Sequence, residues 1–243
     1  MTLGTQNMLV LFIGLLVVRL VVTKGYLSYV RPGLYLPLLI AGAVIALISA
    51  ITLWTAPEGA LRRKERHPGH GSGAGWLLLL PLFALMAIDP APLGAYAAGF
   101  RSAAVPTVDA NTTFPPLPPG LRGAIPLQIN HFAARALFGE PGELEGVPVR
   151  LTGFVTEDAE VTDGFVLTRF VVGCCAADAV PAQVIVHGEA APAPADTWLE
   201  LEGTWRPPEK PIPDHRIHLA RVHLDMTGAS VIPQPEEPYE SAF

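Results

Sequence analysis

The sequence predicts an α-helical transmembrane N-terminal part followed by an all-β C-terminal domain, a five-stranded OB-like barrel preceded by a short helix. Three observations predict this fold class. Long apolar runs lie within the first 100 residues, short segments of alternating polarity lie beyond residue 145, and charge is divided between the two halves. Residues 1–100 carry a net charge of +4, whereas residues 101–243 carry a net charge of −10.

The apolar runs predict three membrane spans, over about residues 7–23, 34–54 and 75–97. The second run has the clearest signal, because its twenty-one residues carry no charge and end in Tyr35 and Trp54, where aromatic belts form. The first run is interrupted only by Arg19. It lacks the basic start and the small-residue cleavage site of a signal peptide, so we expect a retained span.

The third run is strongly apolar only over residues 76–88, and it meets Asp89-Pro90 before a weaker continuation. Basic residues cluster at 62–66, after the second span. If this cluster is cytoplasmic, three spans place the C-terminal domain outside the cytoplasm. We therefore expect a multi-pass protein of a bacterial inner membrane with an extracytoplasmic domain; without a third span the domain would be cytoplasmic.

Beyond the membrane part, the sequence predicts a Pro-rich linker over residues 101–124, a soluble OB-like domain over 125–232 and a tail over 233–243. The acidity of this half disfavours phosphate backbones, so nucleic acid is not an expected partner. Apolar spacing predicts a helix over residues 126–138. Five segments with strand patterns follow, at 146–157, 164–173, 183–187, 198–205 and 216–225.

The sharpest chemical feature is the pair Cys174-Cys175 followed by Asp178. Thiolates and a carboxylate suit a soft cation such as Zn²⁺ or Cu⁺, provided that a turn brings both sulfurs to one side. Two alternatives stay open: a redox pair that forms a reducible disulfide, and two small buried residues at a strand end. The histidines that could complete a metal site are His131, His187, His215, His218 and His223.

Other motifs point away from an enzyme. The chain contains no G-x-S-x-G, Walker loop, H-E-x-x-H or dinucleotide fingerprint, so no catalytic residue is predicted. His215, His218 and His223 cannot all converge from one regular strand, because the second side chain would point away from the other two.

The order of these segments resembles the small subunit of a bacterial two-component permease. The resemblance covers nearly the whole chain, and its most specific part is RFVVGCCAADA at residues 169–179. It implies a membrane N-terminal part, a conserved C-terminal domain of unassigned biochemistry and a large multi-span permease as partner. It also implies a metal-related role, with the family motif falling on Cys174, Cys175 and Asp178.

These observations predict a membrane-anchored accessory subunit of a permease that handles a soft cation such as zinc. Two hypotheses of other classes remain. One is a membrane-tethered thiol oxidoreductase, which would need the two cysteines to cycle between thiol and disulfide. The other is a non-catalytic interaction domain, in which the strands serve for protein docking.

Overall fold

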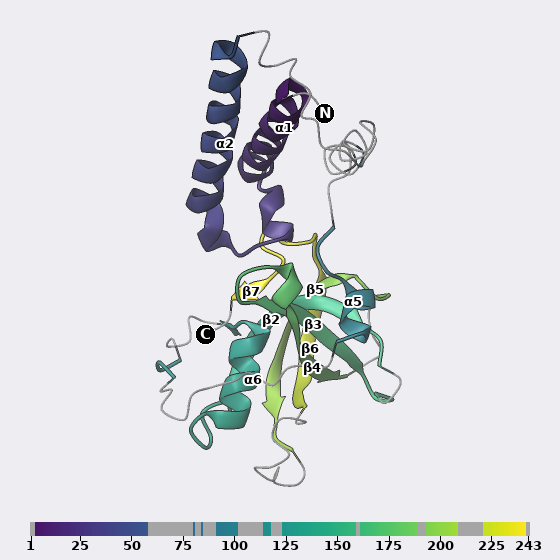
Figure 1. Cartoon of the computed structure of the whole chain (residues 1–243). Helices are drawn as coiled ribbons and strands as arrows, with labels where there is room; N and C mark the ends of the chain where they lie inside the picture. Colours follow the sequence, from purple (N-terminus) through teal and green to yellow (C-terminus); the bar gives the residue numbers. More distant parts are fainter. Residues whose placement is uncertain are drawn as a thin grey trace. The chain divides into compact units, whose positions relative to one another are not determined.

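The computed structural model describes residues 3–57, 80, 84, 91–101, 114–117, 123–158, 161–188, 193–208 and 221–241 (Figure 1). The chain forms two compact units, Met1–Ala91 and Pro92–Phe243.

The first unit contains two long apolar helices, α1 (Leu3–Val22) and α2 (Tyr35–Thr55). The 3-10 turns η1 (Gly25–Ser28) and η2 (Pro32–Leu34) connect them. Both helices have the length and composition of membrane spans, and only 17% and 11% of the residues in their most apolar windows are buried. A core helix of a water-soluble protein would be mostly buried, so the two helices agree with the spans expected at about 7–23 and 34–54.

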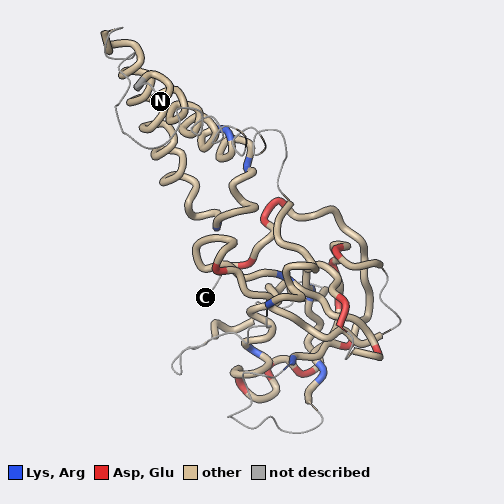
Figure 2. The backbone as a smooth tube through the Cα atoms, turned by 45° about the vertical axis from the view of Figure 1, so that its right-hand side comes forward, with Lys and Arg blue, Asp and Glu red and all other residues tan. Residues whose placement is uncertain are grey.

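Charge is distributed unevenly along this helical hairpin (Figure 2). Its described residues contain no Asp or Glu, and their basic side chains gather around the connection between the helices, at Arg19, Lys24 and Arg31. Apart from Arg19 in the last turn of α1, neither α1 nor α2 carries a charge that would have to be paired within a bilayer.

Small residues allow the two helices to pack closely. A Cβ atom on Gly14 would lie 2.7 Å from the backbone nitrogen of Ala46, and one on Gly42 would lie 3.0 Å from Cγ1 of Val17. Neither position has room for a larger side chain unless the helices separate. Close backbone approach at small residues is the usual way in which helices associate in membranes, where the lipid removes the hydrophobic drive between them.

The third expected span, 75–97, lies mostly outside the described residues. Its last part belongs to the second unit, because the helix α5 (Ala95–Gly99) buries Ala98 against the β domain. The sequence interpretation extended the span too far, since the Ala-rich stretch after Pro92 is apolar enough to continue it. The expected linker at 101–124 also lies mostly outside the described residues.

The described residues of the second unit form a seven-stranded mixed sheet against which the helix α6 (Ile129–Phe138) packs. The strands follow the order β1-β2-β5-β6-β4-β3-β7. Their bounds are β1 (Ile125–Pro126), β2 (Pro148–Thr156), β3 (Phe165–Val172), β4 (Val180–His187), β5 (Trp198–Arg206), β6 (Val222–Val231) and β7 (Glu240–Ser241).

The five long strands correspond to the five strand segments expected from the sequence. β2 also pairs with β3, so the pairings β2–β3, β3–β4, β4–β6, β6–β5 and β5–β2 form a closed series. Only β4–β6 is parallel among these five pairings. The sheet is nevertheless not the clean five-stranded barrel that we expected, because β1 and β7 add parallel pairings to β2 and β3. Two-residue strands are too short to show periodicity.

The bounds of one helix and one strand also differ from those predicted from the sequence. α6 begins at Ile129 rather than at Pro126, because Pro126 lies in β1. β6 runs from Val222 to Val231, whereas the apolar alternation favoured 216–225. The second half of β6 is small and polar, and its pairing with β5 rather than its own pattern keeps it extended.

Two apolar clusters form the core of this unit. The larger one fills the space between the sheet and α6, where Ile129 and Phe132 are fully buried. The smaller one contains Phe154, Phe170 and Trp198, and it also receives Ala98 from α5 and Tyr239 from near the C-terminus.

The C-terminal segment expected as a tail, 233–243, is part of the fold. The carboxylate of Glu240 is buried and accepts the backbone N–H groups of Ile129 (2.7 Å) and Asn130 (2.9 Å), so it caps the start of α6. Arg169 holds the same segment by donating to the carbonyls of Glu237 (2.6 Å) and Pro238 (3.3 Å). These partners are more than 60 residues away in the sequence. No local sequence pattern predicts these hydrogen bonds.

Replacing Gly42 by Leu should destabilise the α1–α2 hairpin by about 1–3 kcal/mol, because the added atoms overlap Val17. Replacing Ala43, the exposed neighbour on the same helix, by Leu should have little effect. The measurement is an SDS titration of the detergent-solubilised protein, followed by energy transfer between labels on the two helices. Equal midpoints for the two variants would contradict the packing described here.

Glu240 should make the stability of the second unit fall as pH rises. Burial raises the pKa of Glu240 to about 6, from an ordinary 4.5, against the opposing effects of the two N–H donors and Arg169. Between these values the folded state keeps a proton that the unfolded state has lost, so stability is lost through this window, by about 2 kcal/mol in total. Hydrogen exchange of the full chain, compared with Glu240→Gln, should show this pH dependence only in the wild type.

A Glu→Gln change at the exposed Glu145 serves as the control, since it alters charge without altering a buried group. If Glu145→Gln removed the same pH dependence, the effect would belong to overall charge rather than to the capping carboxylate.

Candidate metal-binding loop

The loop between β3 and β4, residues 173–179, is called here the cysteine loop. Its centre is a single 3-10 turn, η4 (Ala176–Asp178). The Asp178 carboxylate accepts three backbone N–H groups of the same loop, those of Gly173 (3.1 Å), Cys174 (2.8 Å) and Cys175 (3.4 Å). The side chain of Cys175 in turn accepts the backbone N–H of Asp178. The turn forms because the Asp178 side chain accepts hydrogen bonds from the backbone N–H groups of the residues that directly follow β3.

This turn brings the predicted ligands together. The Sγ atoms of Cys174 and Cys175 and a carboxylate oxygen of Asp178 all lie within 4.8 Å of one another. Neighbouring residues of an extended strand would point their side chains to opposite faces, so the turn is what makes convergence possible. Both thiols are free; Cys174 is exposed and Cys175 is half-buried.

The charges in the loop favour a protonated thiol when no cation is bound. The pKa of Cys174 is raised to about 11, first by its hydrogen bond to Asp178 and then by its hydrogen bond with Cys175. The same thiol, followed by the backbone N–H groups, holds the pKa of Asp178 below its usual range. A thiol with a raised pKa is a weak nucleophile at neutral pH. A bound cation would reverse this balance, because it favours the thiolate.

The structure does not bring the predicted histidines to this loop. His187 lies at the far end of β4, about 23 Å from Val180 along the strand at about 3.3 Å per residue. His131 lies in the first turn of α6, and the pKa of its imidazole is lowered by burial and then by Arg135. His215 and His218 lie outside the described residues. Among the described residues, the ligand group consists of Cys174, Cys175 and Asp178 alone.

Two of the candidate ligand histidines, His187 and His223, form a pair at the far end of β4 that the sequence did not predict. Nε2 of His187 lies 2.7 Å from Nδ1 of His223 on the neighbouring parallel strand β6. The ring centroids are 5.0 Å apart and the rings are inclined by only 16°, so the imidazoles meet edge to edge. This is the geometry of an N–H···N hydrogen bond. A cation between them would need both nitrogens at about 2.0–2.1 Å, which requires the rings to separate.

The surroundings of the histidine pair keep His223 neutral. The pKa of His223 is lowered by burial first, then by His187 and by Arg206 and Arg221, with Asp225 acting in the opposite direction. On the other side, Nδ1 of His187 is buried and has no hydrogen-bond partner among the described residues, and a carboxylate oxygen of Asp163 lies 3.9 Å away. We interpret the pair as a side-chain hydrogen bond that links β4 to β6. The two histidines meet because β4 and β6 pair in parallel, and no local sequence pattern predicts that pairing.

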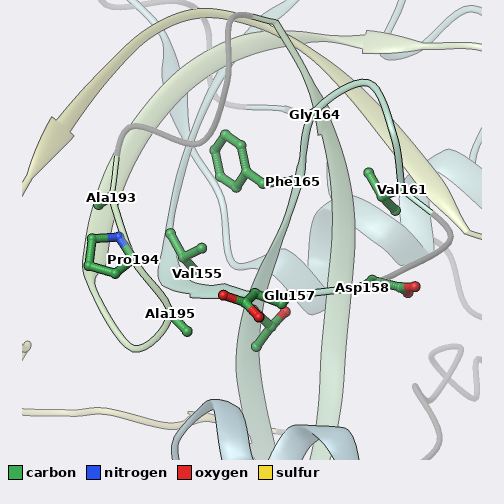
Figure 3. A pocket seen from close by; sticks show the side chains of 10 residues that line it. Val155, Glu157, Asp158, Val161, Gly164, Phe165, Ala193, Pro194 and Ala195 are labelled. Atoms are coloured by element: carbon green, nitrogen blue, oxygen red, sulfur yellow. The ribbon is translucent and has the colours of Figure 1, made fainter.

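A cavity of about 190 Å³ lies between the β2–β3 and β4–β5 connections (Figure 3). Its walls are mostly apolar, and its polar groups include Glu157 and Asp158. Asp158 already forms an ion pair with Arg221, in which Oδ2 of the aspartate lies 2.5 Å from Nη2 of the arginine. The cavity lies beside Phe165, the start of β3, whereas the cysteine loop follows the end of that strand, about 23 Å away at about 3.3 Å per residue. The cavity and the loop are therefore separate sites.

Comparison with protein families matches residues 127–240 to the DUF1980 C-terminal domain. The match includes α6, the five long strands, the cysteine loop and the histidine pair. No curated protein and no solved structure matches the chain. Residues 127–240 are thus similar to the DUF1980 C-terminal domain, in agreement with the expected conserved C-terminal domain of unassigned biochemistry.

Proposed function

We propose that this chain is a membrane-anchored accessory subunit of a permease, and that its cysteine loop handles a soft metal cation, with Zn²⁺ the leading candidate. The observation that carries the proposal is the turn that gathers two sulfurs and a carboxylate oxygen within 4.8 Å. Thiolate and carboxylate are ligands that Zn²⁺ accepts at short distances in tetrahedral sites.

The ligand set suits transient handling better than permanent storage. Three protein ligands leave a fourth position of a tetrahedral site for water or for a ligand from another molecule. Cys174 and Asp178 are exposed, so an incoming ligand has access. The three N–H groups that bind Asp178 fix its carboxylate and leave one of its roughly four lone-pair sites for a cation.

Membrane anchoring is supported by α1 and α2, whose length, composition and small-residue packing fit a helical hairpin in lipid. Two or three spans are too few to build a typical transport path, so the proposal includes a large multi-span permease as partner. The proposed location is a bacterial inner membrane. Placing the second unit outside the cytoplasm requires the apolar residues 75–91 to cross, and a reporter fused to the C-terminus tests this.

We also propose that the five long strands form an OB-like barrel, to which β1 and β7 are additions. The closed series of pairings, with one parallel contact between β4 and β6, supports this assignment. The barrel would hold the cysteine loop between two rigid strands. Fold alone does not indicate function, so the metal proposal depends on the loop and not on the barrel.

The full-length protein in detergent should bind Co²⁺ or Zn²⁺, and Cys174→Ser and Asp178→Asn should each weaken binding at least tenfold by removing a ligand. A cobalt–thiolate absorption band provides the measurement, with Zn²⁺ displacing Co²⁺. His187→Gln is the control, because this residue lies at the other end of β4. A Co²⁺ affinity that Cys174→Ser leaves unchanged, or the absence of the band in the wild type, would refute the metal site.

The affinity should also rise with pH. Because the pKa of Cys174 is about 11 without metal, binding at neutral pH must release its proton. Each thiol proton released on binding corresponds to about a tenfold gain in affinity per pH unit between pH 6 and 8. If alkylation trapping in cells instead found Cys174 and Cys175 cycling through a disulfide, the oxidoreductase hypothesis would replace the metal one.

A further inference from the structure

The short helix α5 presents two opposite faces. Ala98 is only 5% exposed and packs with Phe154 and Trp198 in the smaller core cluster. On the other face, Tyr96 is 81% and Phe100 is 75% exposed, and their rings form an edge-on pair with centroids 4.8 Å apart. The β domain therefore displays a compact aromatic pair to its surroundings instead of burying it.

The aromatic pair is held in place at both ends of α5. The backbone N–H of Leu93 donates to the hydroxyl of Tyr239 (3.0 Å), and that of Ala95 donates to Oδ1 of Asp196 (2.5 Å). After the helix, the guanidinium of Arg101 donates to the carbonyl of Ala179. These contacts tie α5 to the C-terminal segment, to the β4–β5 connection and to the cysteine loop. The exposed rings are thus a fixed feature of the domain surface.

The chain itself limits what can lie against this face. The apolar run at residues 76–88 ends only seven residues before Ala95. Seven residues span at most about 25 Å when fully extended. If the run enters lipid, α5 must lie close to the boundary of the hydrocarbon region. Tyr and Phe on a fixed, uncharged helix face are suited to that boundary, where amphipathic and aromatic groups gain most.

We propose that Tyr96 of α5 and Phe100, the residue that follows this helix, insert into the interfacial region of the bilayer and thereby hold the cysteine loop at the membrane surface. The inference rests on the membrane attachment proposed above, but not on metal binding. The interaction is apolar in origin, because the second unit is acidic and anionic headgroups would repel it. It should therefore be insensitive to salt, unlike attachment through basic residues.

The arrangement would add a specific role to α5 in the proposed function. Through the contact between Arg101 and Ala179, the position of α5 fixes that of the loop that contains Cys174, Cys175 and Asp178. A cation released from the loop would then enter the layer of water next to the membrane, where the mouth of a permease is located.

The test uses the full-length chain in lipid nanodiscs, with Cys174→Ser and Cys175→Ser to leave a single labelling position. An environment-sensitive NBD label is attached through Tyr96→Cys or, separately, Phe100→Cys, and lipids carrying a doxyl quencher at carbon 5 are added. We expect a blue-shifted emission that the doxyl lipids reduce at least twofold, at both low and high salt. The label attached through Glu145→Cys, on an exposed turn after α6, should stay water-like and unquenched.

The outcomes separate the two proposals. A protein that does not enter nanodiscs overturns the membrane attachment, and with it this inference. A protein that enters nanodiscs while both α5 labels remain water-like overturns the interfacial role alone. As a second readout, reconstitution should slow hydrogen exchange in residues 93–101, and the double change Tyr96→Ser/Phe100→Ser should abolish that slowing while leaving the exchange of β2 and β3 unchanged.

Discussion

The parallel pairing of β4 with β6 is the contact on which the arrangement of the β domain depends. Together with the β2–β5 pairing it joins the first three long strands to the last two and closes the series, through the register Val184↔Val222 to His187↔Asp225. Without this contact the sheet would be open between β4 and β6, and the side chains around α6 would lose part of their cover. The cysteine loop precedes one end of β4, and the histidine pair lies at the other end. The cysteines and these histidines, which the sequence suggested as ligands of one metal site, are therefore far apart.

Two carboxylates show how location decides the effect of the same interaction. Asp178 and Glu240 both accept backbone N–H groups, three in one case and two in the other. The exposed Asp178 keeps its hydration, so its hydrogen bonds lower its pKa. Glu240 is buried, and the loss of hydration outweighs its hydrogen bonds, so its pKa is raised. The carboxylate of Asp178 is therefore accessible from solvent, whereas that of Glu240 joins distant segments of the chain.

Local patterns were sufficient for much of this molecule. The apolar runs predicted the two described apolar helices, and the alternation of Leu199 and Leu201 with acidic residues predicted β5. The sequence also pointed to the cysteine loop, since the three candidate ligands lie within five residues. Contacts between distant residues were missed: the capping of α6 by Glu240, the packing of Ala98, and the meeting of His187 with His223. These depend on strand order and on pairings across long loops, which no short window of sequence contains.

The proposed ligands all come from five consecutive residues of one short loop. Chelation by such a set closes only a very small ring of backbone, so it adds little to the order that the loop already has. Capture and loss of an ion would then require no rearrangement of the sheet, and folding would be nearly uncoupled from occupancy. Such a site would equilibrate quickly with the free ion around it. Its residence times would be set by ligand exchange at the cation rather than by opening of the protein.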